Sequence, residues 1–135
     1  MYLPKEGGGN MDELFIIIFA MIGGTMRYGI DQLIPNSPLP IATFSINLVG
    51  CFLLALLNTT LVVSERVPAR LSLGLGTGLI GAFTTFSSFT LEILNLLMGH
   101  DWLIAGLYTL GSLVFGLAGS YLGVQAGHKL KKVSE

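Results

Sequence analysis

Residues 78–89 read Gly-Leu-Ile-Gly-Ala-Phe-Thr-Thr-Phe-Ser-Ser-Phe, within a stretch that has no charged residue between Arg70 and Glu92. A membrane-spanning helix needs roughly 20 mostly apolar residues, so this stretch is long enough to span. The hydroxyl pairs at mid-span predict either a broken helix or a continuous helix whose hydroxyls bond to preceding carbonyls. Gly81 adds conformational freedom. A break at membrane depth must be buried or line a cavity, and its freed carbonyls could bind a cation.

Uncharged stretches recur on both sides of this segment, from Asp31 to Glu65 and from Asp101 to Lys129 if His128 is neutral. Proline-rich or polar turns separate them, and proline favours the first turn of a helix. The sequence therefore predicts an all-α membrane protein with a flexible leader and a basic tail. The expected segments are a leader at 1–11, a four-helix transmembrane domain at 12–128 and a tail at 129–135. The four spans are expected near 12–33, 40–64, 70–98 and 102–127.

Composition supports a membrane protein, because 52% of the 135 residues are hydrophobic and only 11% are charged. Soluble proteins carry about 25% charged residues. The net charge of −1 gives no basic surface for nucleic acid. The single cysteine, Cys51, cannot form a disulfide within the chain. His100 and His128 lie at span ends without a nucleophile or metal spacing, so an enzyme is not expected.

Polar side chains recur at helical spacing inside the second and fourth spans. Thr43 and Asn47 are four residues apart in the second span, as are Tyr108 and Ser112 in the fourth. Residues four apart share a helix face. Each pair could join helices by hydrogen bonds, or it could line a path for an ion, and spacing alone does not separate the two.

Charged side chains and glycines near the spans have similar alternatives. Arg27 could extend to the interface with Asp31 as its partner, or it could attract anions into a vestibule. Glu92 could be a vestibule group or part of an ion pair at a helix end. The fourth span also has glycines at four-residue intervals, which predict close contact with another helix in lipid; these are Gly119, Gly123 and Gly127.

Three motifs together resemble the small fluoride channels called Fluc or CrcB, over residues 12–127. The first is Gly-Gly-Thr-Met-Arg-Tyr at 23–28, and the second runs from Pro40 to Gly50 and contains Thr-Phe-Ser-Ile-Asn-Leu-Val-Gly. The third and most specific is Gly-Ala-Phe-Thr-Thr-Phe-Ser-Ser-Phe at 81–89, in which Ser88 replaces the threonine usual in the family.

The resemblance implies an antiparallel dimer with two anion pores and a central sodium ion. The third helix would break in the segment from Gly81 to Thr84, and the backbone carbonyls of these two residues would bind Na+. Ser87 and Ser88 match hydroxyl positions of the family. The implied fluoride path comprises Asn47, Phe86, Phe89, Thr43, Ser87, Ser88, Tyr108 and Ser112, with Arg27 and Glu92 in the vestibule. The implied function is passive export of fluoride across the plasma membrane.

Two other functions fit four short spans. A small multidrug-type exporter needs a membrane-embedded carboxylate to couple protons to its substrate. Only Glu92 lies well inside a span, and the first span has none, which speaks against an exporter. A structural membrane subunit would leave the hydroxyl and phenylalanine cluster of the third span unexplained.

The loop charges predict an orientation. With four spans, the two termini and the loop at 65–70 share one side, which carries six of the seven lysines and arginines. Positively charged loops favour the cytoplasm, so both termini are expected there. An antiparallel dimer would then form with a paralogue of opposite orientation, or with a second copy if insertion is mixed. The six are Lys5, Arg66, Arg70, Lys129, Lys131 and Lys132; Arg27 is the exception.

Overall fold

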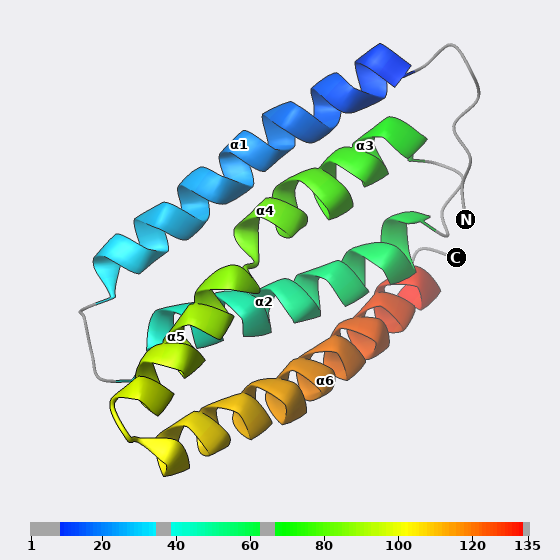
Figure 1. Cartoon of the computed structure of the whole chain (residues 1–135). Helices are drawn as coiled ribbons and strands as arrows, with labels where there is room; N and C mark the ends of the chain where they lie inside the picture. The colour runs from blue at the N-terminus through cyan, green and yellow to red at the C-terminus, as the bar shows by residue number, and fades with distance from the viewer. Residues whose placement is uncertain (1–8, 35–38, 63–66, 134–135) are drawn as a thin grey trace.

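The computed structural model of the chain describes residues 9–34, 39–62 and 67–133, and within these residues it is helical without a β-strand. Four helical stretches of the described residues are long and apolar enough to cross a membrane (Figure 1). This confirms the predicted all-α membrane architecture. The elements are α1 (Gly9–Leu33), α2 (Ile41–Leu57), η1 (Asn58–Val62), α3 (Ala69–Leu73), η2 (Gly74–Ile80), α4 (Gly81–Phe83), α5 (Ser87–Met98) and α6 (Trp102–Val133).

The helices extend beyond the expected bounds at both ends of the chain. Helix α1 begins at Gly9, inside the segment expected to be a leader, and residues 1–8 lie outside the described part. Helix α6 continues to Val133, so the lysines expected in a tail lie on its last turns. Lysine is a good helix former and is favoured near a helix C-terminus, where the carbonyl ends carry partial negative charge.

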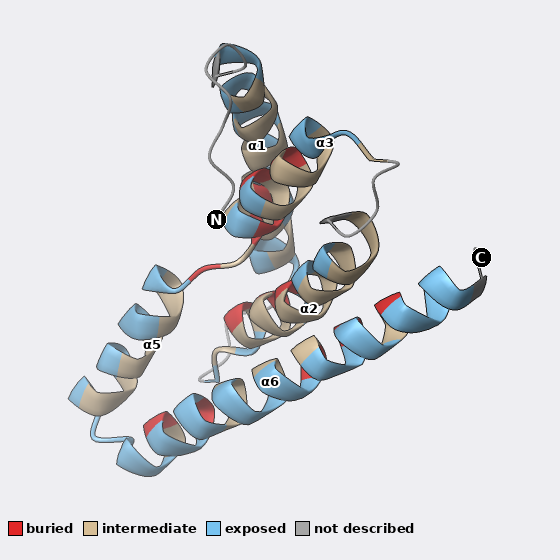
Figure 2. Cartoon of the chain, turned by 90° about the vertical axis from the view of Figure 1, so that its right-hand side faces the viewer, coloured by how far each residue is buried: buried red, intermediate tan, exposed pale blue. Residues whose placement is uncertain are grey.

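The spans alternate in direction, so that α1 begins and α6 ends at the same end of the molecule (Figure 1). Helix α2 packs along α6, whereas α1 packs against η2 and α4. The first half of the third span therefore packs mainly on α1, whereas α5 packs on α6, and α2 contacts both halves (Figure 2). Large apolar side chains such as Leu103 and Leu107 are exposed along α6, as is typical of a surface that faces lipid.

Glycines bring α6 into contact with the backbone of α2, as their spacing predicts. A Cβ atom at Gly123 would collide with the Phe52 carbonyl oxygen, and one at Gly127 would lie 2.7 Å from the Cβ of Thr59. At Gly119, a Cβ would lie 3.1 Å from the Leu48 side chain. This surface of α6 against α2 and η1, called the glycine seam below, leaves no room for a side chain at Gly123 or Gly127.

The third span is interrupted between α4 and α5. Phe83 is the last helical residue before the break, and Thr84 is extended with φ −78° and ψ 158°. The break thus spans 84–86, slightly later than the Gly81–Thr84 segment expected from the resemblance. Gly81 is itself helical, with φ −59° and ψ −37°, so its freedom is not used for the break. Thr84 does bond back to the Ile80 carbonyl at 3.0 Å, as expected of a mid-span threonine.

Candidate functional site

The side chain of Asn47 binds the backbone at the break of the third span. Its Oδ1 accepts a hydrogen bond from the Thr85 amide at 2.9 Å, and its Nδ2 donates to the Thr85 carbonyl at 2.9 Å. These two bonds fix which end of the carboxamide is oxygen. Asn47 therefore joins α2 to the break, as the hydrogen-bonding alternative for this residue predicts. One of its two N–H groups remains outside this pair of bonds.

The hydroxyl of Thr85 caps the N-terminus of α5. It accepts a hydrogen bond from the Ser88 amide at 3.2 Å, and it lies 3.3 Å from the Ser87 hydroxyl. It also donates to the Ser88 hydroxyl at 3.2 Å. Thr85 thus satisfies an amide at the first turn of α5 that has no partner within the helix. Of the two alternatives for the third span, the broken helix is observed, and the Thr85 hydroxyl bonds forward to Ser88 instead of back to a preceding carbonyl.

Glu92 accepts hydrogen bonds from two other helices. Thr43 of α2 donates to its Oε1 at 2.6 Å, and Tyr108 of α6 donates to its Oε2 at 2.7 Å. Thr43 is only 3% exposed, so its hydroxyl needs this partner. Of the two alternatives for Glu92, the ion pair at a helix end does not form among the described residues. The one ion pair there joins Arg70 Nε to Asp12 Oδ1 at 2.8 Å, without hydrogen-bond geometry.

A polar cavity of about 310 Å³ lies beside these residues, between α1, α2 and α5. Its walls bear positive, negative and neutral polar groups, so it is suited to water and small ions. Arg27 lines this cavity, and no Arg27–Asp31 ion pair forms within the described residues. The polar residues of the wall include Arg27, Asp31, Thr43, Ser88, Glu92 and Asn95.

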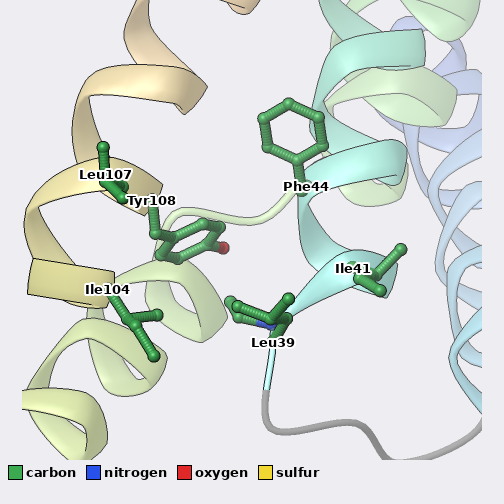
Figure 3. A pocket seen from close by; sticks show the side chains of 7 residues that line it. Leu39, Ile41, Phe44, Ile104, Leu107 and Tyr108 are labelled. Carbon is green, nitrogen blue, oxygen red and sulfur yellow. The ribbon is translucent and has the colours of Figure 1, made fainter. Parts of the chain in front are cut away.

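Three aromatic rings run from the break to α6. The centroids of Phe86 and Phe89 are 6.0 Å apart, and those of Phe89 and Tyr108 are 5.1 Å apart. Phe86 is 79% exposed in this chain. Tyr108 also borders an apolar groove of about 270 Å³, where its ring lies between Leu107 on α6 and the start of α2 (Figure 3). Of the motif's phenylalanines, Phe86 is thus presented at the surface, Phe89 is half-buried and Phe83 is a core residue at 5% exposure.

Two further predicted groups carry polar atoms without partners. The Ser112 hydroxyl is buried and makes no hydrogen bond to any described residue. The carbonyls of Gly81 and Thr84 receive no backbone or side-chain hydrogen bond from the described part of the chain. The structure therefore brings the break, Asn47 and the α5 hydroxyls together, and it leaves Ser112 apart from their hydrogen-bond network.

Residues 14–124 match the sequence model of the family described as CrcB-like protein, Camphor Resistance (CrcB). The chain belongs to this family. The matched region includes all three motifs and every residue of the candidate site.

Several curated CrcB relatives have similar lengths. The chain is 40% identical over 117 residues to the fluoride-specific ion channel FluC 2 of Listeria monocytogenes, covering 87% of this chain and 91% of the relative. It is 42% identical over 120 residues to FluC 2 of Ligilactobacillus salivarius, covering 89% and 88%. It is 41% identical over 122 residues to FluC 1 of Bacillus cereus, covering 88% and 89%.

Some residues of this CrcB site were not predicted from the sequence. Thr85 was expected only to bend a helix, and Asn95 was not singled out. The spacing of Ser88, Glu92 and Asn95 places them on one face of α5, and this pattern could have indicated a shared polar wall. The role of Thr85 had no such signal, because it depends on where the helix restarts.

Proposed function

We propose that the chain is one subunit of a fluoride-selective channel through which fluoride leaves the cell passively across the plasma membrane. The observation that carries this proposal is the polar cluster at the break, which borders a cavity in a chain whose curated relatives are named fluoride-specific ion channels. Fluoride is small and strongly hydrated, so a protein path must replace its water by other donors. A channel needs no catalysed reaction, and the family speaks against an exporter or a purely structural subunit.

The available donors suggest a division of roles within the fluoride path. Thr43 and Tyr108 each use their single hydroxyl hydrogen on Glu92, so we assign them to positioning that carboxylate. Asn47 keeps one N–H outside its bonds to Thr85. The hydroxyl hydrogen of Ser88 stays available because its oxygen accepts from Thr85.

The Ser112 hydroxyl completes the proposed set of donors, whereas Ser87 uses its single hydroxyl hydrogen on Thr85 Oγ1, because the hydrogen of Thr85 is on Ser88. Ser87 is exposed near the start of α5, and the buried Ser112 hydroxyl has no partner among the described residues. Ser112 lies one helical turn beyond Tyr108 on α6, so it could receive an ion that has passed the aromatic residues. Several weak sites in series allow an ion both to enter and to leave.

The exposed ring of Phe86 supports a dimer. The positive edge of an aromatic ring attracts an anion weakly, which makes Phe86 and Phe89 suitable pore walls. Phe86 at 79% exposure is only half of such a wall in one subunit. A second subunit in antiparallel orientation would supply the other half and form two pores. Arg27 would draw anions into the vestibule beside Glu92.

Sodium is the proposed structural ion of this dimer. Carbonyl oxygens of unwound backbone are suitable Na+ ligands at membrane depth. The Gly81 and Thr84 carbonyls fit this requirement, since neither receives a hydrogen bond from the described residues. Bound between two subunits, the cation would lower the cost of an anion in a medium of low dielectric constant.

Fluoride efflux from liposomes tests the channel itself. Purified protein is reconstituted, and release of fluoride is measured with a selective electrode beside release of chloride. We expect fast fluoride release and little chloride release. Protein-free liposomes and a known fluoride channel are the controls. Absence of fluoride release while the known channel works would refute the function.

Orientation and partner are tested by C-terminal reporters, one active only in the cytoplasm and one only outside. Of the six positive charges expected on the side of the termini, Lys5 and Arg66 lie outside the described residues. Arg70 and the α6 lysines lie at the end of the molecule where α1 begins and α6 ends. We propose cytoplasmic termini and an oppositely oriented paralogue as partner. Equal signals from both reporters would instead indicate dual topology and a dimer of identical chains.

A further inference from the structure

The break in the third span releases carbonyl groups that a continuous helix would occupy. In an α-helix the amide of residue i donates to the carbonyl of residue i−4. The Gly81 carbonyl would then accept from the Thr85 amide, and the Thr84 carbonyl from the Ser88 amide. Neither bond forms within the described chain, although Thr84 still donates to the Ile80 carbonyl at 3.0 Å. The series of helical backbone hydrogen bonds therefore ends at the Ile80 carbonyl, before the carbonyls of Gly81 and Thr84.

Each missing donor is held by a specific side chain. The Thr85 amide donates to Asn47 Oδ1 at 2.9 Å, and the Ser88 amide donates to Thr85 Oγ1 at 3.2 Å. The carbonyls of Ala82 and Phe83 also lose their helical donors, but no side chain of the described residues holds those donors away. The two amides that side chains bind are therefore the helical donors of the Gly81 and Thr84 carbonyls, which are the two carbonyls that the family resemblance assigns to sodium.

Backbone geometry and exposure agree with this correspondence. Rotation of Thr84 to a ψ of 158°, against about −42° in a helix, nearly reverses the direction of its carbonyl. Gly81 is exposed in the single subunit, and Thr84 is half-buried. Neither residue that carries these carbonyls is therefore enclosed in the core of the chain. Thr85 itself is buried, at 9% exposure.

We propose that Asn47 and Thr85 are positioning residues of the sodium site, which keep the Gly81 and Thr84 carbonyls free by binding the amides that would otherwise occupy them. The inference rests on the proposed function, because it concerns the ion assigned to the dimer there. It gives Asn47 a role through the backbone that is separate from contact with fluoride. It also gives Thr85, which lies outside the proposed fluoride path, a direct influence on cation affinity.

Thr85→Val provides the main test, since valine has a similar shape but cannot accept the Ser88 amide. The purified channel is heated in Na+ or in K+ at the same ionic strength, and its unfolding midpoint is recorded over a Na+ titration. Ligand binding to the folded state raises the midpoint. We expect the Na+ concentration for half of this rise to increase by about 10–100-fold in the variant, as for other residues that orient metal ligands.

Three variants make the result specific. Thr85→Ser keeps the hydroxyl and should restore the wild-type titration. Thr109→Val removes a hydroxyl that bonds only to the Ala105 carbonyl of its own helix, at 2.8 Å, and should also titrate as wild type. Asn47→Ala removes the side chain that accepts from the Thr85 amide, and it should weaken the rise of the unfolding midpoint with Na+. This variant keeps the inference testable if Thr85→Val does not fold.

The outcomes separate this inference from the proposed channel. A variant midpoint that falls equally in Na+ and K+ would make Thr85 merely structural and overturn the inference, as would an unchanged Na+ titration. A wild-type midpoint indifferent to Na+ would refute both the sodium site and this inference. Fluoride efflux from the same preparation would then still decide the channel function on its own.

Discussion

The glycine seam and the break of the third span are two contrasting ways to use a helix backbone in a membrane. At the seam, Gly123 and Gly127 bring the backbone of α6 against α2, and the helical hydrogen bonds stay intact. At the break, the helical backbone hydrogen bonds are interrupted between Phe83 and Ser87. The side chains of Asn47 and Thr85 supply some of the missing acceptors. The seam excludes side chains, whereas the break depends on them.

The difference separates what holds the subunit together from what leaves it chemically available. A seam of small residues gains from van der Waals contact and exposes no polar atom to lipid. The break carries carbonyls, hydroxyls and an exposed Phe86, and irregular backbone of this kind at membrane depth must be buried in protein or line a cavity. Substitutions at the seam should therefore affect folding, and those at the break should affect transport.

The largest effect is expected at the seam, from Gly123→Ala. The new methyl group would collide with the Phe52 carbonyl oxygen, which cannot move aside as a side chain could. We expect a loss of about 1–3 kcal/mol or more and little folded protein by gel filtration and thermal unfolding. Gly106→Ala on the same helix is the control, because nothing lies within 4 Å of its Cβ position. A Gly123→Ala protein as stable as the control would show that the seam is not tightly packed.

Phe86→Ile and Phe89→Ile should give the next largest effect, this time at the break. Isoleucine supplies apolar volume but no ring edge, so each variant should assemble and lose most fluoride flux in liposomes. Circular dichroism and gel filtration check assembly separately from flux. Wild-type flux in either variant would remove that phenylalanine from the pore.

Asn47→Asp sharpens the comparison within the break. A carboxylate can still accept from the Thr85 amide, but when ionised it cannot donate to the Thr85 carbonyl. We expect lower flux because of the added negative charge, and a stability cost of about 1–3 kcal/mol for the unpaired carbonyl. Unchanged flux with lower stability would mean that Asn47 serves only to join α2 to the break.

The smallest effect is expected in the turn between α5 and α6, away from both regions. His100 has φ 63°, a left-handed conformation that favours glycine. His100→Gly should raise stability by about 0.5–1 kcal/mol in thermal unfolding and leave flux unchanged. His100→Ala also removes the ring near Trp102 but keeps the strain, so it should show no gain. A gain in both variants would assign the effect to the ring.

Periodicity and charge were sufficient to predict four spans, because apolar length between charged residues depends on the sequence alone. The glycine seam was equally accessible, since residues four apart must share one face of a continuous helix. The break was harder to place. It was expected from Gly81 onward, yet Gly81 is helical, because the interruption follows from how Asn47 and Thr85 bind the backbone beyond it.

Glu92 shows the same limit for the site. Its position one turn from the hydroxyl cluster indicated a vestibule group or an ion pair, but its two acceptor contacts come from α2 and α6. Contacts between residues 49 positions apart, as for Thr43 and Glu92, depend on helix packing that local spacing does not specify. The roles of the individual path residues stay predictions until flux is measured.

Helix α6 also sets a relation between this protein and the thickness of its bilayer. Its 32 residues extend about 48 Å at 1.5 Å each, whereas a hydrocarbon core is about 30 Å thick. The excess must be taken up by tilt or by projection beyond the core. Because Lys129, Lys131 and Lys132 lie on the last turns, projection places three cations among the lipid headgroups. Anionic lipids would then hold that end of the helix, at about 1 kcal/mol per lysine.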